Sequence, residues 1–181
     1  MNFERIDQGV DVDPLIAAIK AQPELWDEIT ARQTYPGSAH HDTNCIFLRG
    51  PYAFTYAEYM GNTKAYDYPM LDALMPVVHN VIRPILIDLG VTELGYVLVV
   101  RLKAGGEIDP HIDEGAYADH YERFHLVLTS EPGNEFTVAD QTVHMAPGEL
   151  WWFNHKRLHS VVNGSAHERI HVIFDAVRAG Q

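Results

Sequence analysis

The sequence predicts a mainly β protein with N-terminal helices, in which a helical first half supports a C-terminal antiparallel β-barrel of jelly-roll type. Three observations lead to this fold class. Apolar residues recur at helical spacing in two stretches of the first half. After Gly95 the chain becomes a series of brief β-branched or aromatic runs, and turn-forming pairs such as Gly105-Gly106 and Pro147-Gly148 separate them. Many short strands with regular turns are typical of a barrel or a sandwich.

The first half is predicted to contain two helical segments. The first covers about residues 14–31, and Pro23 is expected to divide it into two short helices. The second covers about residues 70–88, with an interruption near one of its prolines, Pro76 or Pro84.

Strands are predicted on both sides of the second helix. Residues 45–48 and 52–56 precede it as two short strands around a turn, and they would extend a sheet. The predicted barrel strands follow it, at residues 96–103, 124–129, 135–138, 142–145, 150–154, 159–162 and 169–177.

Length and composition indicate one domain over residues 1–181. Residues 1–94 would provide helical support and extra strands, and residues 95–178 would form the barrel core. A chain of this length buries roughly 70% of the surface that its unfolded form exposes. Its content of 46% hydrophobic and 21% charged residues is ordinary for a globular protein, which argues against disorder.

Charge and cysteine content exclude several classes of partner. The 13 Lys and Arg against 25 Asp and Glu give a net charge of -12, so the average surface repels nucleic acid and anionic lipid. Cys45 alone cannot form an internal disulfide, and the acidic N-terminus is unlike a signal peptide. The apolar stretches are short or broken, below the roughly 20 residues that a membrane span needs. We therefore expect a soluble, cytoplasmic protein without nucleic-acid or membrane partners; the sequence does not predict its oligomeric state.

A His-x-Asp motif, His111 and Asp113, is the first sign of a metal site. On a strand, the two-residue period puts both side chains on one face. His159 lies on a distant predicted strand and can complete a set of two imidazoles and one carboxylate. This set is the facial triad of non-haem iron(II) oxygenases. A hydrogen-bonded surface pair is the simpler interpretation of His-x-Asp taken alone.

Arginine placement adds a second sign. Arg169 begins an otherwise apolar predicted strand, where a guanidinium requires an anionic partner. A 2-oxoglutarate carboxylate would satisfy it, and so would a neighbouring Asp or Glu in the barrel wall. Arg123 and His125 project to one side of another predicted strand, and both could help to hold the same co-substrate.

In their order along the chain, these motifs resemble the aspartyl/asparaginyl β-hydroxylase family of Fe(II)/2-oxoglutarate-dependent oxygenases. The resemblance is carried by residues 101–113, 123–125, 148–154, 159–163 and 169–171. It covers roughly residues 96–175, whereas residues 1–94 resemble the family only loosely.

The resemblance implies a double-stranded β-helix, a cupin-like jelly roll. It assigns the functional residues position by position: His111, Asp113 and His159 to Fe(II), Arg169 to the distal carboxylate of 2-oxoglutarate, and Arg123 with His125 near the metal-binding end of that co-substrate. The implied reaction uses O2 and hydroxylates an amino-acid substrate, with succinate and CO2 as co-products. The substrate is an Asp- or Asn-type residue in a peptide or a free amino acid such as proline. Asp113 favours the free amino acid, because the animal peptidyl hydroxylases of the family lack this carboxylate ligand.

Substrate contacts are predicted in the polar loop 35–44 and the strand that follows it. His41, Thr43 and Arg49 could bind a carboxylate or an amide there, although solvated loop histidines are the simpler interpretation. Residues 115–122 could form a lid. Two other classes remain open: a non-catalytic cupin-like module that binds a metal or a ligand, and a cupin isomerase or dioxygenase that works without 2-oxoglutarate.

Overall fold

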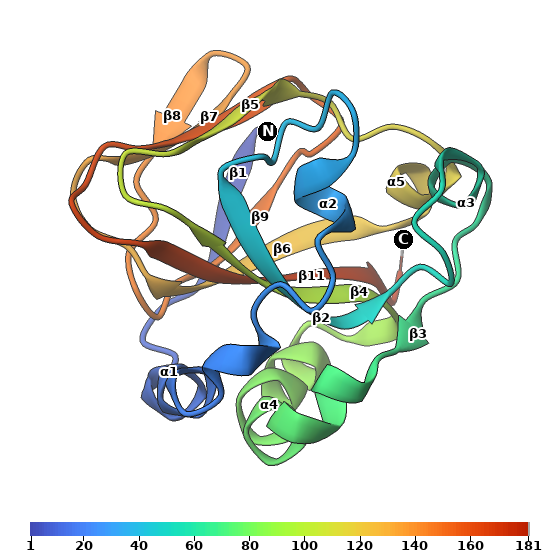
Figure 1. Ribbon diagram of the computed structural model, residues 1–181, viewed down its shortest axis with the longest axis horizontal. Helices are drawn as coiled ribbons and strands as arrows, with labels where there is room; N and C mark the ends of the chain where they lie inside the picture. Colours follow the sequence, from blue (N-terminus) through green and yellow to red (C-terminus); the bar gives the residue numbers. More distant parts are fainter. Residues whose placement is uncertain (181) are drawn as a thin grey trace.

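The computed structural model describes residues 1–180, apart from the side chain of residue 59 (Figure 1). The elements follow in the order β1 (Phe3–Asp7), α1 (Asp13–Lys20), η1 (Pro23–Leu25, a 3-10 helix), α2 (Ala31–Thr34), β2 (Thr43–Gly50), α3 (Tyr56–Gly61), β3 (Tyr66–Asp67), α4 (Pro69–Asp88), β4 (Val91–Leu102), β5 (Glu107–His111), α5 (Ala116–His120), β6 (Glu122–Thr129), β7 (Asn134–Val138), β8 (Gln141–Val143), β9 (Leu150–Phe153), β10 (His159–Asn163) and β11 (Arg169–Arg178).

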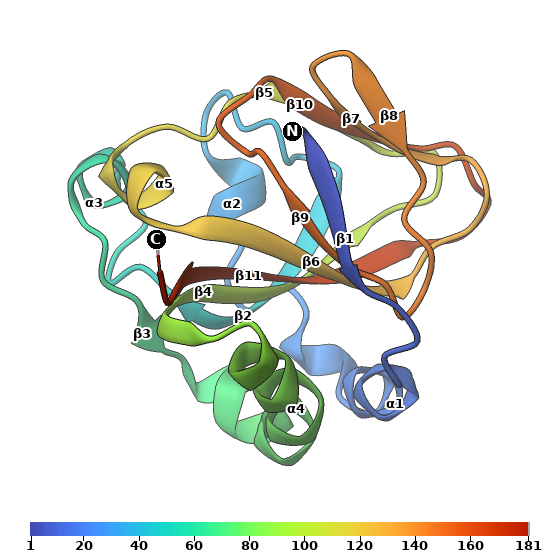
Figure 2. The ribbon, with the colours of Figure 1, turned by 180° about the vertical axis from the view of Figure 1, so that it is seen from behind.

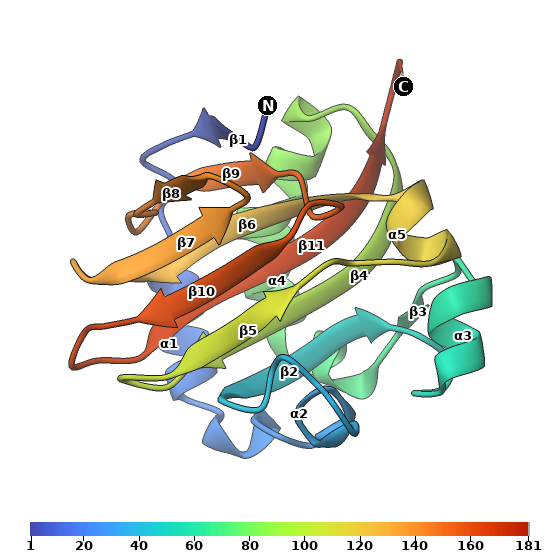
Figure 3. The same cartoon turned by 90° about the horizontal axis from the view of Figure 1, so that it is seen from above.

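The strands form two antiparallel sheets that lie face to face, and α1 and α4 cover the outer side of the larger one (Figures 1 and 2). The large sheet has seven strands in the order β1-β9-β6-β11-β4-β2-β3, and the small sheet has four in the order β5-β10-β7-β8. Figure 3 shows the small sheet lying over the middle of the large one. Within residues 1–180 no strand pairing closes the two sheets into a ring. The predicted fold class, mainly β with a jelly-roll core, is confirmed.

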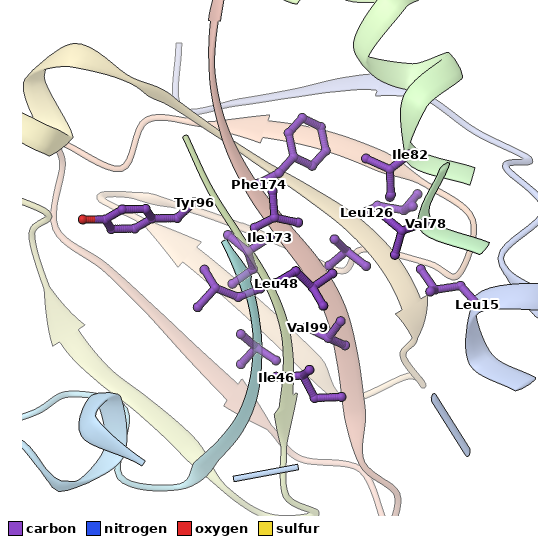
Figure 4. Close-up of a cluster of buried hydrophobic side chains, with 14 of the residues drawn as sticks. Leu15, Ile46, Leu48, Val78, Ile82, Tyr96, Val99, Leu126, Ile173 and Phe174 are labelled. Carbon is purple, nitrogen blue, oxygen red and sulfur yellow. The ribbon is translucent and has the colours of Figure 1, made fainter. Parts of the chain in front are cut away.

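Alternation along β11 separates the hydrophobic core from the space between the sheets. Val172 and Phe174 belong to the core beneath α1 and α4 (Figure 4). Arg169, His171 and Asp175 lie on the other face of the strand, and all three are buried. Because a strand turns successive side chains to opposite faces, β11 packs the core on one side and carries polar groups on the other.

The neighbouring strand β6 repeats this pattern. Phe124 and Leu126 are fully buried in the core under the helices. Arg123 and His125 share the opposite face and point between the sheets. The two central strands of the large sheet therefore carry their polar groups toward the small sheet.

Helix α4 differs from the prediction, because it runs for 20 residues without a break and contains both Pro76 and Pro84. An interior proline removes a backbone hydrogen bond and costs about 3 kcal/mol. Burial of apolar side chains offsets this cost, at roughly 1.5–3 kcal/mol for each large residue. The buried residues of α4 are Met70, Leu71, Leu74, Val78, Val81, Ile82 and Ile85.

The expectation that this stretch is too broken for a membrane span is therefore wrong. Among the residues that the structure describes, α4 is the one helix with the length and composition of a membrane span. Its apolar side packs on α1 and β2. Core helices of soluble proteins share this length and composition, so these two properties of α4 are weak evidence for a membrane span.

Three more elements correct the prediction. Residues 14–31 divide near Pro23 as predicted, but the second piece is only a 3-10 turn: α1 ends at Lys20, the turn covers Pro23–Leu25, and Asp27 adopts a left-handed backbone with φ of 62°. Residues 52–56 contain no strand, because the Thr55 side chain accepts a hydrogen bond from the Glu58 N–H and caps α3. Strand β1 was not predicted; Phe3 holds it in the core between the sheets.

Candidate functional site

Three side chains converge where β5 and β10 meet. His111 is the last residue of β5, and His159, the first residue of β10, is its partner in the strand pairing. Their ring centroids are 4.2 Å apart, and His111 Nε2 lies 3.7 Å from Asp113 Oδ1. One ligand atom from each of these three residues lies within 4.8 Å of those from the other two, which is close enough to hold one metal ion.

Asp113 reaches the cluster differently from the prediction. Strand β5 ends at His111, so the two-residue period of a strand does not place the carboxylate. Instead, the Asp113 N–H donates to the carbonyl of His155 at 3.1 Å, which holds the segment after β5 against the loop after β9. The predicted grouping is observed, although the reason given for it is wrong.

The two imidazoles are oriented by backbone carbonyls. His111 Nδ1 lies 2.7 Å from the Asp109 carbonyl, and His159 Nδ1 lies 2.9 Å from the Arg157 carbonyl. A carbonyl oxygen can only accept, so Nδ1 of each neutral ring carries the proton and Nε2 keeps its lone pair. Both rings therefore present Nε2 as a metal ligand.

Burial and charge set the protonation states of the cluster. Burial lowers the pKa of His159 to about 4 and also lowers the pKa of His111. Burial alone would raise the pKa of Asp113, but Arg123 and the nearby histidines hold it below its ordinary value. At neutral pH the site therefore offers two neutral imidazoles and one carboxylate, the protonation states that a divalent metal requires.

Arg123 was expected near 2-oxoglutarate, but its donors are engaged by two carboxylates. Its Nε and Nη2 bond Asp175 Oδ1 and Oδ2 at 2.8 and 3.0 Å, and its Nη1 bonds Asp113 Oδ2 at 2.6 Å. Burial would lower the pKa of Arg123, but these two acids raise it well above its usual value. Arg123 thus fixes one oxygen of Asp113 and leaves the other facing His111.

A tyrosine completes this network, and neither it nor Asp175 was predicted. The Tyr117 hydroxyl donates to Asp175 Oδ2 at 3.1 Å and accepts from the Tyr96 N–H at 2.6 Å. A Cβ at Gly95 would collide with this hydroxyl, so glycine is required there. In the sequence, Asp175 could have been found as an acid on the same strand face as Arg169.

Arg169 is buried, with 4% of its surface exposed, and no acid pairs with it among residues 1–180. Its Nη2 lies 3.1 Å from His171 Nδ1, and its guanidinium lies 5.7 Å from the centroid of the Phe136 ring. Burial lowers the pKa of Arg169 to about 9. The alternative in which a wall carboxylate neutralises Arg169 is therefore not what the structure shows.

One further polar atom, on the histidine next to Arg169, has no partner in the described chain. His171 Nδ1 lies 3.3 Å from His125 Nδ1, and His171 Nε2 is buried without a hydrogen-bond partner in the described chain. Burial holds the pKa of both histidines well below the usual value. A buried cation beside an unused polar atom fits an anionic ligand with several acceptors, such as a dicarboxylate.

A cavity of about 360 Å³ opens beside His111, Asp113 and Arg123. Sequence reasoning missed two of its polar lining residues, Arg32 on α2 and His40 on the next loop. The His40 ring packs edge-on against His111 at 4.7 Å, so it is not a solvated loop residue.

The three predicted substrate residues do not line this cavity. The side chain of His41 is 50% exposed, and Thr43 is buried and donates to the His40 carbonyl. Arg49 forms an ion pair with Asp67 and bonds backbone carbonyls. The proposed lid, residues 115–122, contains α5, whose Tyr117 and Ala118 are buried.

Fold and site together define a double-stranded β-helix protein with a candidate mononuclear metal centre. Two solved structures share the fold. An oxidoreductase of the 2OG-Fe(II) oxygenase family from Burkholderia pseudomallei has a TM-score of 0.60 at 20% identity, over 90% of this chain and 78% of that one. A Pseudomonas putida prolyl-4-hydroxylase has a TM-score of 0.55 at 14% identity, over 99% and 94%.

The family follows from sequence comparison. Residues 56–179 match the model of the aspartyl/asparaginyl beta-hydroxylase family. This match spans more than half of the chain, and the protein belongs to that family, which confirms the resemblance. Over 80 residues, or 44% of this chain, the sequence is also 32% identical to an L-proline cis-4-hydroxylase of Rhizobium meliloti (strain 1021). The aligned stretch covers 29% of the length of that relative.

Proposed function

We propose that this protein is an Fe(II)- and 2-oxoglutarate-dependent dioxygenase that hydroxylates an amino-acid substrate. The observation that carries the proposal is Arg169, a buried guanidinium without an acidic partner in the described chain, in the same sheet sandwich as the His111, Asp113 and His159 cluster. A metal-binding module without a dicarboxylate ligand gives no reason for a buried, unpaired cation.

The donor set fits iron. Two neutral imidazoles and one carboxylate on one side of an ion leave other coordination positions open. His111, Asp113 and His159 would hold Fe(II), and Arg169 would bind the distal carboxylate of 2-oxoglutarate, with His125 beside it. When bound, iron, 2-oxoglutarate and O2 would supply oxidative decarboxylation to succinate and CO2, coupled to hydroxylation of a C–H bond.

The protein's own residues would position these groups. Arg123 holds Asp113 in one orientation through its bond to Oδ2, and the carbonyls of Asp109 and Arg157 hold the two imidazoles. The cavity beside the cluster would bind the substrate and exclude water from it. Preorganised ligands of this kind require no rearrangement when the metal binds.

For the substrate, we propose an Asp- or Asn-type residue in a peptide or a free amino acid such as proline. The partial match to an L-proline cis-4-hydroxylase supports the free amino acid. We also propose a single oxygenase domain over residues 1–181, a cytoplasmic location, and no nucleic-acid partner. The net charge of -12 supports the last of these.

The test combines metal binding with product analysis. The apoprotein is titrated with Fe(II) without oxygen, then given 2-oxoglutarate, O2 and a panel of free amino acids and short peptides. Succinate release together with a product heavier by one oxygen supports the proposal. Metal binding without succinate release under any condition would instead identify a non-catalytic module.

A further inference from the structure

We infer that Arg32 binds the free carboxylate of the substrate, so that the cavity takes a small amino acid with an apolar side chain and not an internal residue of a peptide. This inference rests on the proposed function. It concerns a residue of α2, which lies outside the segment 56–179 that matches the family.

The first step is the position of Arg32. Helix α2 packs on β2, beside the space between the two sheets (Figure 1). From there the side chain lines the same cavity as His111 and Asp113. A group bound to Arg32 would therefore lie in the chamber that the metal cluster faces.

The second step is the lack of an acidic partner. The Arg32 guanidinium contacts only neutral groups, the Thr43 hydroxyl at 3.4 Å and the Cys45 sulfur at 3.8 Å. Across residues 1–180 no carboxylate lies within 4.0 Å of it, whereas the other arginine of the cavity, Arg123, has two. A half-buried guanidinium in a cavity wall without an acid is complementary to a ligand carboxylate, which it can bind through two parallel hydrogen bonds.

The third step is the character of the other walls. Phe47, Phe54, Leu98 and Ile173 give the cavity aromatic and aliphatic surfaces. Its volume of about 360 Å³ is at the small end of the range for ligand pockets. A chamber of this size and lining is complementary to a compact apolar side chain. The cavity also has one further acid, Glu114, which offers a negative charge for the ammonium of a free amino acid.

The test compares carboxylates with amides. Wild-type protein loaded with Mn(II) and 2-oxoglutarate is titrated calorimetrically with L-proline, L-leucine and L-phenylalanine, and with the carboxamide of each. We expect at least one amino acid to bind, and its carboxamide to bind roughly tenfold or more weakly, as for the loss of a charge-assisted hydrogen bond. Wild-type protein that binds none of the acids, or binds the amides equally well, would overturn the inference.

Variants then assign the effect to Arg32. In Arg32→Gln, the affinity for the amino acid should fall by the same factor, roughly tenfold or more, and the affinity for the carboxamide should not change. Arg32→Lys should recover part of the lost affinity for the amino acid. The matched control is Arg101→Gln, which removes an arginine that pairs with Glu168 outside the cavity; it should bind as the wild type does. Arg32 makes no ion pair in the described chain, so thermal unfolding of Arg32→Gln should stay close to that of the wild type.

A last measurement separates this inference from the proposed function. Release of succinate from 2-oxoglutarate without a prime substrate should be the same in the control Arg101→Gln and in the wild type. If the wild type shows none with or without amino acids, the proposed function fails. If turnover persists and Arg32→Gln binds the acids as tightly as the wild type, or requires more 2-oxoglutarate, only the role of Arg32 is rejected.

Discussion

Asp175 links the large sheet, through Arg123, to the candidate metal centre, so Asp175→Asn should lower both the stability of the fold and the affinity for metal. The substitution keeps the shape of the side chain but removes the charge that faces Arg123 through two bonds of 2.8 and 3.0 Å. The side chain of Asp175 is 3% exposed and that of Arg123 is 17% exposed, so solvent screens this ion pair only slightly. Breaking a buried pair costs about 3–5 kcal/mol. Since Asp113 remains as a partner, we expect the lower end, about 3 kcal/mol.

The metal centre should respond through Arg123. With Asp175 neutral, the guanidinium is balanced by Asp113 alone and competes more strongly with a metal for that carboxylate. Loss of a group that orients a metal ligand typically lowers metal affinity roughly 10- to 100-fold. Asp175→Asn should fall in this range, although Asp175 is not one of the three clustered ligands.

Urea unfolding of the apoprotein and calorimetric titration with Mn(II) measure the two effects. Tyr117→Phe is the matched control, because it removes one neutral donor from Asp175 and keeps the charge. Because it also removes the hydroxyl that accepts from the buried Tyr96 N–H, it should cost about 1–3 kcal/mol, and it should leave the metal affinity near the wild-type value. An Asp175→Asn protein that unfolds and binds Mn(II) as the wild type does would refute the proposed coupling.

Three further predictions concern the site. His111→Ala and His159→Ala should each abolish Fe(II) binding and turnover, measured by anaerobic titration and succinate release, and full activity in either variant would reject the triad. Arg169→Ala should raise the 2-oxoglutarate concentration for half-maximal succinate release roughly tenfold or more without changing metal affinity; an unchanged co-substrate requirement would remove Arg169 from this role. His125 and His171 are buried, and their pKa values lie well below 6.5, so below that pH the unfolded chain binds more protons than the folded one. Their contribution to stability is therefore present above about pH 6.5 and is lost as the pH falls, at up to about 2.7 kcal/mol per pH unit for two protons. Urea unfolding from pH 7.5 to 5 should give a flatter profile for His125→Asn/His171→Asn, and equal slopes would contradict this assignment.

The grouping of the metal site could be predicted because few residue types make a metal ligand set. His111 and Asp113 are close in the chain, and a third ligand had to come from a distant strand. The sequence does not specify that His159 pairs directly with His111, since the register of two distant strands depends on the packing of both sheets. Helix α4 shows the same limit, because Pro76 and Pro84 predict a break near one of them, and tertiary packing overrides both.

Substrate residues were predicted less well, because a polar loop does not reveal which side chains turn inward. His41 and Arg49 have the right chemistry, but Arg49 is paired with Asp67. Arg32 follows the predicted helical segment 14–31 directly and was given no role, yet it lines the cavity. The sequence alone does not reveal that Arg32, and not Arg49, faces the cavity, because this depends on the path of the chain from α2 to β2.

Arg123 and Arg169 lie between the two sheets and Arg32 lies in the cavity wall on α2, and the partners of each arginine indicate its role. Arg123 has two carboxylates, Asp113 and Asp175, and is complete without a ligand, so it acts as a structural support for the metal centre. Arg169 and Arg32 have no acid in the described chain, and each calls for an anion from outside it. Under the proposed function, an α-keto diacid would bring a carboxylate to Arg169, and an amino acid would bring one to Arg32. The chemistry of the site therefore follows less from where its arginines lie than from which of them the protein leaves without a counter-ion.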